Sequence, residues 1–479
     1  MKQVFVVVDL GGNSRVAVID LDGKLLAIRQ KQSEYFMDPD FPFGGMSFDA
    51  EQWKADIFQA TREVLAEAGD VEVIAVSSSS QREGGVLIGK NGESLVGFPN
   101  SDMRGMEYMM QTNWARVAEL TFLTPLPMYT ASKFRATAQK QPEVAAKTRY
   151  ITSISDWAGF LFTNEVVWER SQAMHSAVYE LAADRWSDEL CQIIGIEASI
   201  LPPLCQAGTI LGHITAEASA ATGIPESAVF VVGGADTQLA MEGVQALAGD
   251  IIIVNGTTTP IVAVSDSIVS SPCWISPHVL AGKYMLEVNA GSTGSNLDAL
   301  MQQLQPAKPL AQIEAEGAAK GLPGCTAVFS TNMFIPGDMM MTGAFLVDNP
   351  LRAYVSPDDY VHALILNIGF QIKAGMDLLL EHVPSASGQI IGTGGGFSGS
   401  VCAQAVANTT GKDIYIYENF RQATISGCIN LCCKALDLPL PARVLKEVVT
   451  PASSPQFDSY YADWLAAKSA LGVIQKQLF

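Results

Sequence analysis

A strand, a glycine-containing turn and a second strand occur twice in this chain, about half of its length apart. The apolar strands are residues 4–8 and 15–19 in the first copy, and residues 251–254 and 261–264 in the second. Short apolar runs that flank Gly, Asn and hydroxyl residues are typical of antiparallel strand pairs. The repeat predicts a duplicated α/β fold with two halves and a cleft between them.

The chain length of 479 residues agrees with this organisation, because one domain commonly has roughly 100–200 residues. We predict two domains, 1–243 and 244–479, with residues 243–250 as the hinge. An apolar content of 48% and a charged content of 16% exclude a disordered, collagen-like or coiled-coil chain.

The net charge of −19 argues against a surface that follows a nucleic-acid backbone. No apolar run reaches the ~18 residues of a membrane span, and the N-terminal run is too short for a signal peptide. The eight cysteines show no metal-binding spacing, and Cys428, Cys432 and Cys433 are expected in the core. We therefore expect a cytoplasmic protein without a nucleic-acid or membrane partner.

Three further apolar runs, residues 71–76, 228–232 and 389–391, are predicted strands, and each is followed by a series of Ser or Gly residues. Residues 50–68 and 357–382 have the periodicity of helices that cover a sheet. Ligands of α/β sheets bind just beyond the carboxyl ends of strands. The Ser-rich and Gly-rich segments are therefore the candidate binding regions.

The two glycine turns are candidate phosphate sites, because hydroxyls and free N–H groups in such turns are good phosphate donors. Asp9 ends the first strand beside one turn; it is either a ligand or only a turn former. The turn residues are Gly11, Gly12, Asn13 and Ser14 in the first half, and Gly256, Thr257 and Thr258 in the second. Together they suggest a nucleotide phosphate held from both sides.

Gly394, Gly396 and Gly399 have the spacing of a dinucleotide-binding fingerprint and follow a short predicted strand. Too few residues remain after them for a complete dinucleotide domain. We favour contact with the adenosine or α-phosphate of a nucleotide. An NAD-dependent oxidoreductase and a purely structural turn remain alternatives.

Asp236 follows Gly233 and Gly234 at a predicted strand end. Glycines there would let a substrate approach, and the carboxylate could accept a hydroxyl proton. The alternative is an N-cap, because residues from Gln238 onward look helical.

Charged residues in two loops could bind vicinal hydroxyls through alternating carboxylates and guanidinium groups. Solvated salt bridges are the alternative for both loops. The residues are Gln81, Arg82 and Glu83 in one loop, and Asp102 and Arg104 in the other. His278 follows Pro277 in a further loop, where a structural role is expected.

In their order along the chain, these motifs resemble the FGGY family of carbohydrate kinases, which have the actin-like (ribonuclease H-like) ATPase fold. The family opens with Asp-x-Gly-Thr, which residues 9–12 resemble, and its catalytic Gly-Gly-x-Asp is similar to residues 233–236. Its second phosphate motif resembles Gly256-Thr257, and its adenosine motif resembles residues 394–396 with 407–411. Residues 82–84, 154–157 and 277–279 resemble the autoinducer-2 kinases of the family, although xylulose, gluconate and glycerol kinases share the framework.

The resemblance implies phosphoryl transfer from ATP, with Mg²⁺, to a hydroxyl of a small sugar, polyol or sugar-like ketone. It implies that Asp236 is the catalytic base, that Asp9 and Asp236 hold the metal, and that a homodimer is common. The implied substrate residues are Gln81, Arg82, Glu83, Asp102, Arg104, Asp236 and Gln238. The implied nucleotide residues are Gly11, Gly12, Asn13, Ser14, Gly256, Thr257, Thr258, Gly394, Gly395, Gly396, Ser398 and Asn408.

Three positions depart from the family pattern. Asn408 stands for the usual Asp, Gln422 stands for the usual Glu, and the Thr expected after Gly11 is missing, so the first turn is one residue short. Gly12, Asn13 and Ser14 could compensate for that Thr. The alternative is a sugar-binding homologue that has lost or weakened its kinase activity.

Overall fold

The computed structural model describes residues 1–269, 272–329, 342–350, 354–382 and 388–478. The chain forms two compact units, each assembled from several segments. Unit 1 comprises 1–245, 275–284 and 423–442, and unit 2 comprises 246–274, 285–422 and 443–479. The first change of unit lies within the predicted hinge, whereas the two later segments of unit 1 were not predicted.

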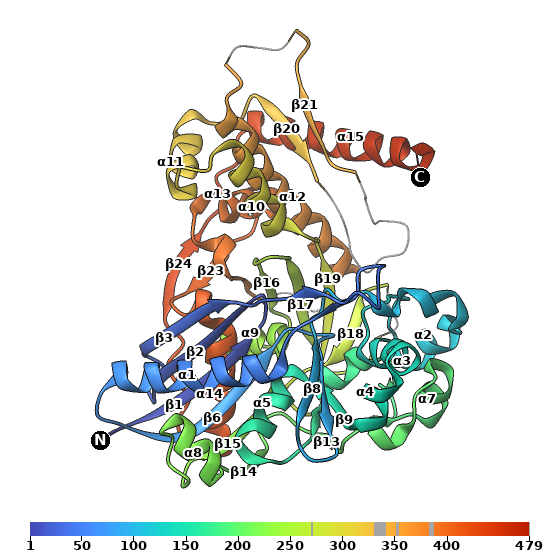
Figure 1. Ribbon diagram of the computed structural model, residues 1–479. Coiled ribbons are helices and arrows are strands. Elements are labelled where there is room, and N and C mark those ends of the chain that lie inside the picture. Colours follow the sequence, from blue (N-terminus) through green and yellow to red (C-terminus); the bar gives the residue numbers. More distant parts are fainter. Residues whose placement is uncertain (270–271, 330–341, 351–353, 383–387, 479) are drawn as a thin grey trace. The chain divides into compact units, whose positions relative to one another are not determined.

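Unit 1 contains a six-stranded mixed sheet in the order β14-β15-β6-β1-β2-β3 (Figure 1). β1, β2 and β3 form an antiparallel meander, whereas β6 runs parallel to both β1 and β15. The strands are β1 (Lys2–Leu10), β2 (Asn13–Asp20), β3 (Leu25–Gln32), β6 (Val71–Ser80), β14 (Ile210–His213) and β15 (Val229–Ala235).

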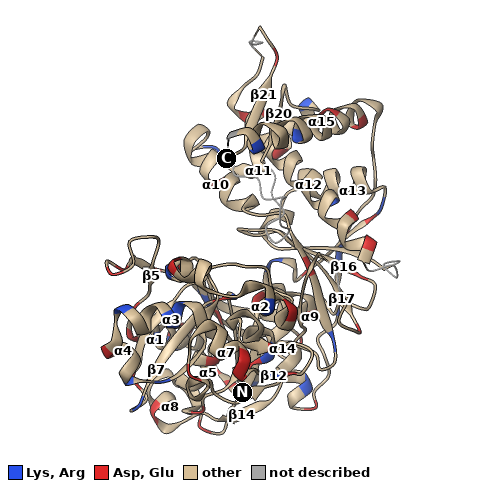
Figure 2. Ribbon diagram, turned by 90° about the vertical axis from the view of Figure 1, so that its right-hand side faces the viewer, with Lys and Arg blue, Asp and Glu red and all other residues tan. Residues whose placement is uncertain are grey.

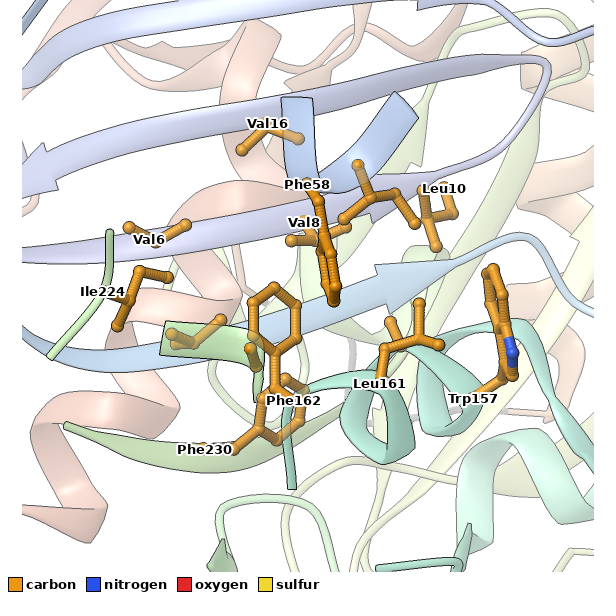
Figure 3. Packing of buried hydrophobic residues seen from close by; sticks show 14 of the residues in the cluster. Val6, Val8, Leu10, Val16, Phe58, Trp157, Leu161, Phe162, Ile224 and Phe230 are labelled. Carbon is orange, nitrogen blue, oxygen red and sulfur yellow. The ribbon is translucent and has the colours of Figure 1, made fainter. Parts of the chain in front are cut away.

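Helices cover both faces of this sheet because its central strands are apolar on both sides. α1 (Ala50–Ala68) and α5 (Ile154–Thr163) pack on one face, against the even-numbered residues of β1 and β2. Figure 3 shows this packing, with Val6, Val8 and Val16 near Phe58. α9 (Asp236–Gly243) and α14 (Ala423–Ala435) supply residues to the core of the other face, which contains the odd-numbered residues.

The rest of unit 1 consists of small sheets and short helices. The strands are β4 (Phe36–Met37), β5 (Met46–Ser47), β7 (Gly85–Gly89), β8 (Ser94–Phe98), β9 (Thr148–Ser153), β10 (Trp168–Glu169), β11 (Tyr179–Glu180), β12 (Arg185–Trp186) and β13 (Leu204–Cys205). The helices are η1 (Arg104–Gln111), α2 (Trp114–Thr121), α3 (Thr130–Lys140), α4 (Pro142–Lys147), α6 (Arg170–Ala173), η2 (Met174–Ser176), α7 (Asp188–Ile194), η3 (Ala198–Ile200) and α8 (Ala216–Thr222).

Unit 2 is built on a second sheet, of order β18-β19-β17-β16-β22-β23-β24. Its strands are β16 (Ile251–Val254), β17 (Pro260–Ser265), β18 (Trp274–Pro277), β19 (Tyr284–Asn289), β22 (Ile390–Thr393), β23 (Ile414–Tyr417) and β24 (Leu445–Val449). β20 (Cys325–Val328) and β21 (Ala344–Val347) form a separate hairpin. The helices are α10 (Thr293–Leu304), α11 (Leu310–Lys320), α12 (Pro357–His382), η4 (Gly395–Phe397), α13 (Ser400–Thr410), η5 (Phe420–Gln422) and α15 (Pro455–Leu478).

By length and apolar composition, α12 could cross a membrane. Most of its side chains are nevertheless buried within unit 2, where it packs against α13, β20, α10 and α11. We interpret α12 as the core helix of unit 2, since a core helix passes the same test of length and composition.

The predicted helices 50–68 and 357–382 are confirmed as α1 and α12, and the second strand pair is confirmed as β16 and β17. The predicted start of the second strand at residue 15 is wrong. β2 begins at Asn13, so the first turn consists of Gly11 and Gly12 alone. The predicted end of the strand at residue 76 is also wrong, because β1 and β15 pair with β6 through Ser80.

All eight cysteines are free, and Cys428, Cys432 and Cys433 are buried on α14, as predicted. Lys and Arg are interspersed with Asp and Glu on the elements of both units (Figure 2).

Candidate functional site

An ion pair lies next to the first glycine turn, between the strands that the turn connects in unit 1. Asp9 near the end of β1 stands opposite Arg15 of β2 in the antiparallel register. Arg15 Nε donates to Asp9 Oδ2 at 3.0 Å, and Arg15 Nη2 contacts the same oxygen. The negative charge of Asp9, with a smaller contribution from Asp236, raises the pKa of Arg15. Asp9, Arg15 and Asp236 therefore share one electrostatic environment.

Asp236 is the first residue of α9 and is half-buried. Its Oδ1 accepts hydrogen bonds from Thr237 N at 2.7 Å and from Thr237 Oγ1 at 3.3 Å. Burial raises the pKa of Asp236 to about 6; Arg82 opposes this shift, and the charges of Asp9 and Glu83 add to it. The N-cap position of α9 belongs to Ala235, which makes no side-chain capping bond. The predicted capping alternative for Asp236 is therefore wrong.

Glu83 lies in the loop after β6, in a left-handed conformation with φ of 58°. Its Oε1 is 2.7 Å from Nδ1 of His175, and both side chains are buried. Burial alone would raise the pKa of Glu83, but His175, Arg82 and Lys133 lower it below its ordinary value. Lys133 Nζ also donates to the backbone oxygen of Glu83 at 2.9 Å, which fixes this strained residue.

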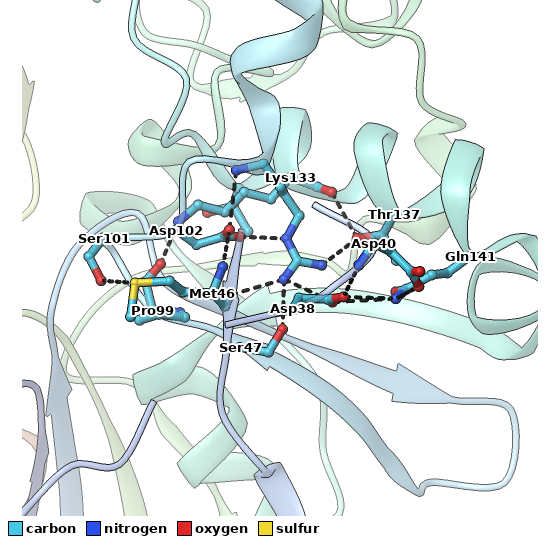
Figure 4. A network of polar contacts seen from close by, with 12 residues as sticks. Asp38, Asp40, Met46, Ser47, Pro99, Ser101, Asp102, Lys133, Thr137 and Gln141 are labelled. Atoms are coloured by element: carbon cyan, nitrogen blue, oxygen red, sulfur yellow. Dashed lines mark hydrogen bonds and ion pairs between the residues drawn. The ribbon is translucent and has the colours of Figure 1, made fainter. Parts of the chain in front are cut away.

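The predicted substrate residues Asp102 and Arg104 belong to a network of polar contacts within unit 1, and Figure 4 shows Asp102 in this network. Both are buried, with Arg104 only 2% exposed. The guanidinium donates to Asp102 at 2.7 Å and to three other protein groups, from Thr137, Met46 and Ser47. The rings of Phe41 and Phe98 each lie 4.4 Å from Arg104 Cζ. These contacts hold Arg104 within the fold of this region, and sugar binding by the pair stays a prediction.

Ser14 also differs from our expectation. Its Oγ lies 2.9 Å from Ser33 Oγ, and it lines a cavity of about 490 Å³ together with residues of α1 such as Trp53. Side chains alternate between the faces of a strand, so Ser14 faces α1, whereas Arg15 faces the side of α9 and α14. The structure therefore does not bring the Ser14 hydroxyl to Asp9, Arg15 and Asp236.

One predicted substrate residue, Gln238, carries a buried polar atom, Oε1, that has no hydrogen-bond partner among the described residues. The side chain of Gln81 interacts with the hydroxyl of Tyr35. The other end of Gln238 donates to Ser276 Oγ at 3.1 Å. An unpaired buried amide atom costs free energy unless a ligand or water satisfies it. His278 Nε2 is unpaired as well, and burial lowers the pKa of His278 to about 4, so this side chain is neutral at pH 7.

In unit 2, the β16–β17 turn leaves Gly256 and Thr257 exposed and Thr258 half-buried. Gly256 N donates to Thr258 O at 3.0 Å, and Ser295 N of α10 donates to Thr257 O at 3.2 Å. A Cβ at Gly294 would lie 2.2 Å from Gly256 O, so only glycine lets α10 approach the turn this closely.

The glycine triplet, Gly394 to Gly396, lies beside this turn. Asn255 N donates to Thr393 O at 2.8 Å, and Gly396 N donates to Asn255 O at 2.9 Å. Gly394 has a φ of 89°, and a Cβ at Gly396 would lie 2.2 Å from the Asn255 side chain. The structure thus brings two predicted nucleotide motifs together through Asn255.

Of the other predicted nucleotide residues, Ser398 follows the triplet closely in the sequence and Asn408 lies on α13. Arg421 Nε donates to Ser398 Oγ at 3.0 Å. Asn408 Oδ1 already accepts from Gln404 Nε2 and Ala452 N, both at 2.8 Å. The predicted polar role of Asn408 is therefore at least partly internal to unit 2.

Sequence reasoning missed four residues in these groups. Arg15 could have been found, because strand alternation places it on the same side as Asp9 once β2 is known to begin at Asn13. Asn255 directly precedes Gly256. His175 and Arg421 meet their partners only through tertiary packing, and no local signal marks them.

Two units, each with a mixed sheet and its own strand, glycine turn and strand, form the architecture of actin-like two-domain ATPases. The chain belongs to the FGGY family of carbohydrate kinases. The family model for the N-terminal domain matches residues 4–243, and that for the C-terminal domain matches residues 204–436. The protein is thus an ATP-dependent sugar kinase, which excludes the oxidoreductase alternative.

Relatives of known name support the same family. A putative sugar kinase, YoaC, of Bacillus subtilis (strain 168) is 32% identical over 466 residues, covering 96% of both chains. The autoinducer-2 kinase of Salmonella typhimurium (strain LT2) is 26% identical over 448 residues, covering 87% of this chain and 83% of the relative.

Solved structures share the fold. A ligand-bound xylulose kinase from Lactobacillus acidophilus has a TM-score of 0.83 at 19% identity, covering 100% of both chains. The glycerol kinase of Plasmodium falciparum with ADP has a TM-score of 0.84 at 17% identity, covering 98% of both chains.

Proposed function

We propose that Asp236 is the general base of this kinase and that the acceptor is a hydroxyl of a small sugar, polyol or sugar-like ketone. The observation that carries the assignment is the place of Asp236 directly after β15, where burial raises the pKa of its carboxyl group to about 6. A base works best when its pKa lies close to the working pH.

In the proposed reaction, the acceptor hydroxyl gives its proton to the Asp236 carboxylate. The hydroxyl oxygen then bonds to the γ-phosphorus of ATP, and the bond from that phosphorus to the β–γ bridging oxygen breaks, so ADP leaves. Arg15 carries positive charge beside Asp9 and Asp236. This positive charge would stabilise the negative charge that develops on the transferred phosphoryl group.

Asp9 and Asp236 would hold Mg²⁺, partly through water. Two neighbouring carboxylates suit this ion, which is typically bound by one or two carboxylates plus substrate phosphates. Within the described ranges no cluster of three or more His, Cys, Asp or Glu residues is present, so the ion would depend on the nucleotide for further ligands. When bound, Mg²⁺ would neutralise phosphate charge during transfer.

The nucleotide would bind to unit 2. The N–H and hydroxyl groups of the exposed Thr257 are suited to its phosphates, and the triplet Gly394–Gly396 is suited to the adenosine side. Arg421 is a further candidate, because its guanidinium lies at Ser398 beside the triplet.

The acceptor would bind among Gln81, Arg82, Glu83 and Gln238. The buried Oε1 of Gln238, which has no partner among the described residues, favours a ligand that carries hydroxyl groups. The relatives named autoinducer-2 kinase favour a sugar-like ketone over a long polyol. A panel of sugars, polyols and autoinducer-2, with ADP formation as the readout, tests this choice.

The test of the base is Asp236→Asn, which should lower kcat by ~10²–10⁴-fold while the protein still folds and binds ATP. Asp188→Asn is the matched control, because Asp188 is the first residue of α7 as Asp236 is of α9. A rate of Asp236→Asn within twofold of the wild type would refute the assignment.

A sugar-binding protein with little or no turnover is the second candidate. The specific observation in its favour is the two-residue first turn, together with the placement of Ser14 on the α1 face. Calorimetric binding of a sugar without ADP formation from any bound sugar would support it over the kinase.

We further propose that the protein is a homodimer in the cytoplasm and has no nucleic-acid or membrane partner. Eight free cysteines suit a reducing compartment. Light scattering of the purified chain measures the oligomeric state, and an exclusively monomeric protein would remove that part of the proposal.

A further inference from the structure

Two loops of the proposed sugar site belong to different strands of the unit 1 sheet. One follows β6 and carries Arg82 and Glu83, and the other ends β15 and leads to Asp236. A short segment, Glu169–Gln172 from β10 and α6, contacts both strand ends. Its polar side chains Glu169, Ser171 and Gln172 are at most 2% exposed.

Ser171 binds the loop that leads to Asp236. Its Oγ accepts a hydrogen bond from Ala235 N at 3.0 Å and donates to Glu169 Oε2. A Cβ at Gly234 would lie 3.0 Å from both Glu169 Oε2 and Ser171 Oγ. The backbone immediately before Asp236 therefore packs against the side chains of Glu169 and Ser171 and is hydrogen-bonded to Ser171.

Gln172 binds the other loop. Its Nε2 donates to Ser80 O at 3.1 Å and to Ser80 Oγ at 2.9 Å. Ser80 is the last residue of β6 and directly precedes Gln81. Adjacent residues of α6 thus hold the two loops.

The segment is itself anchored by buried groups. Glu169 N donates to Asp156 Oδ2 at 3.0 Å, and Ser153 Oγ donates to the same oxygen at 2.5 Å. Burial raises the pKa of Glu169 to about 8 and that of Asp156 to about 7. Burial thus favours the neutral form of both carboxyl groups, which would limit the negative charge near Asp236.

We propose that Glu169, Ser171 and Gln172 are positioning residues that set the place of Asp236 relative to the loop of Arg82 and Glu83. This inference rests on the proposed role of Asp236. The three side chains act through the backbone of Ala235 and Ser80, so they affect the alignment of the base with the acceptor hydroxyl.

The direct test is Ser171→Ala. A displacement of a reacting group by about 1 Å can cost ~10²-fold in rate. We expect kcat to fall by ~10–100-fold, with KM for ATP and for the sugar within about twofold of the wild type. A kcat that stays within twofold of the wild type would overturn the proposal.

Ser176→Ala is the matched control. Ser176 is also fully buried; its Oγ donates to Ala173 O at 2.6 Å and accepts from Val178 N at 3.1 Å. The substitution Ser176→Ala therefore removes the same kinds of hydrogen bond as Ser171→Ala, and we expect a similar decrease in thermal stability for the two variants. A similar decrease of kcat in both variants would reduce Ser171 to a structural role and overturn the proposal.

A readout that needs no turnover is hydrogen exchange of the Ala235 amide. Exchange should become faster in Ser171→Ala and stay unchanged in Ser176→Ala, because only Ser171 accepts from that amide. Unchanged exchange in Ser171→Ala would overturn the contact on which the proposal depends.

A double-mutant cycle separates this inference from the assignment of the base. If Ser171 acts through Asp236, adding Ser171→Ala to Asp236→Asn should lower the residual rate by less than twofold. A further loss as large as that in the wild-type background would overturn the positioning role. Wild-type turnover by Asp236→Asn would instead refute the base itself, while the exchange result would still stand.

Discussion

The two strand–glycine turn–strand motifs have different chemistry. In unit 1, the turn of Gly11 and Gly12 lies above the ion pair of Asp9 and Arg15. In unit 2, residues 255–259 contain no ionisable side chain, and Gly256 and Thr257 are exposed. The first motif therefore supplies charge, and the second supplies neutral hydrogen-bond donors.

The turns also differ in how they are held. Gly11 O accepts from Ser33 Oγ at 2.5 Å and from Tyr35 OH at 3.2 Å, so side chains of the adjacent chain segment fix the first turn. The second turn is held by the backbone N–H of Ser295, which donates to Thr257 O at 3.2 Å, and by Thr259 Oγ1, which donates to Asn255 Oδ1 at 3.0 Å. Side-chain substitutions can therefore disturb either turn.

Among substitutions within the two motifs, Asp9→Asn should have the largest effect. It removes a charge that pairs with Arg15 and would help to hold Mg²⁺, so kcat should fall by ~10²–10³-fold in a coupled ADP assay. The loss should not be recovered by saturating sugar.

Asp20→Asn is the control for this change. Asp20 is likewise a buried carboxylate on the same strand pair, where it accepts from Lys2 Nζ at 2.5 Å. It should lose stability but keep kcat. Equal losses of kcat for the two variants would mean that charge in unit 1 serves the fold and not the reaction.

The pH profile gives the next effect. Asp236 must be ionised to accept a proton, so kcat/KM should fall about tenfold per pH unit below the pKa of about 6. Arg82 favours the ionised form, so Arg82→Gln should raise this pKa and move the acid limb to higher pH. A limb that stays in place, or moves to lower pH, contradicts the role of Arg82.

Thr257→Val tests the neutral motif of unit 2. The loss of a hydrogen bond to a charged phosphate costs about 1.5–3 kcal/mol, which corresponds to ~10-fold or more in kcat/KM for ATP. Thr257→Ser keeps the hydroxyl and should retain most of the activity. An effect confined to the sugar KM would place Thr257 outside the nucleotide site.

Elements with a continuous apolar pattern could be predicted from the sequence. Helices 50–68 and 357–382 and the strands β16 and β17 follow from local periodicity alone. The extension of β6 through Ser77–Ser80 could not be predicted, because it depends on pairing with β1 and β15 on both sides. Polar residues become strand residues there only in the folded sheet.

The site shows the same limit. Position beside glycines at predicted strand ends marks Asp9 and Gly256 as candidates, whereas the catalytic role of Asp236 is predicted only through the resemblance to the family. The burial of Arg104 between Phe41 and Phe98 could not be predicted, since Phe41 lies far from Arg104 in the sequence. Glu83 and His175 contact each other only through tertiary packing, so no local motif indicates that they are partners.

The smallest effect is expected from Ser14→Ala, which decides how the shortened first turn works. Ser14 could restore the missing hydroxyl only if it reached the phosphate, but its Oγ pairs with Ser33 on the α1 face. We therefore expect kcat and the KM for ATP to stay within twofold of the wild type.

Asn13→Ala is the companion variant, because Asn13 is exposed at the start of β2 and, by strand alternation, belongs to the face of Arg15. It should have the larger effect of the two. The loss of a donor to the developing charge typically costs ~10²–10³-fold in rate. A decrease of kcat by tenfold or more in Ser14→Ala would therefore mean that the turn rearranges to bring Ser14 to the phosphate. The first motif would then supply a neutral donor as well as charge, and the contrast between the two motifs would weaken.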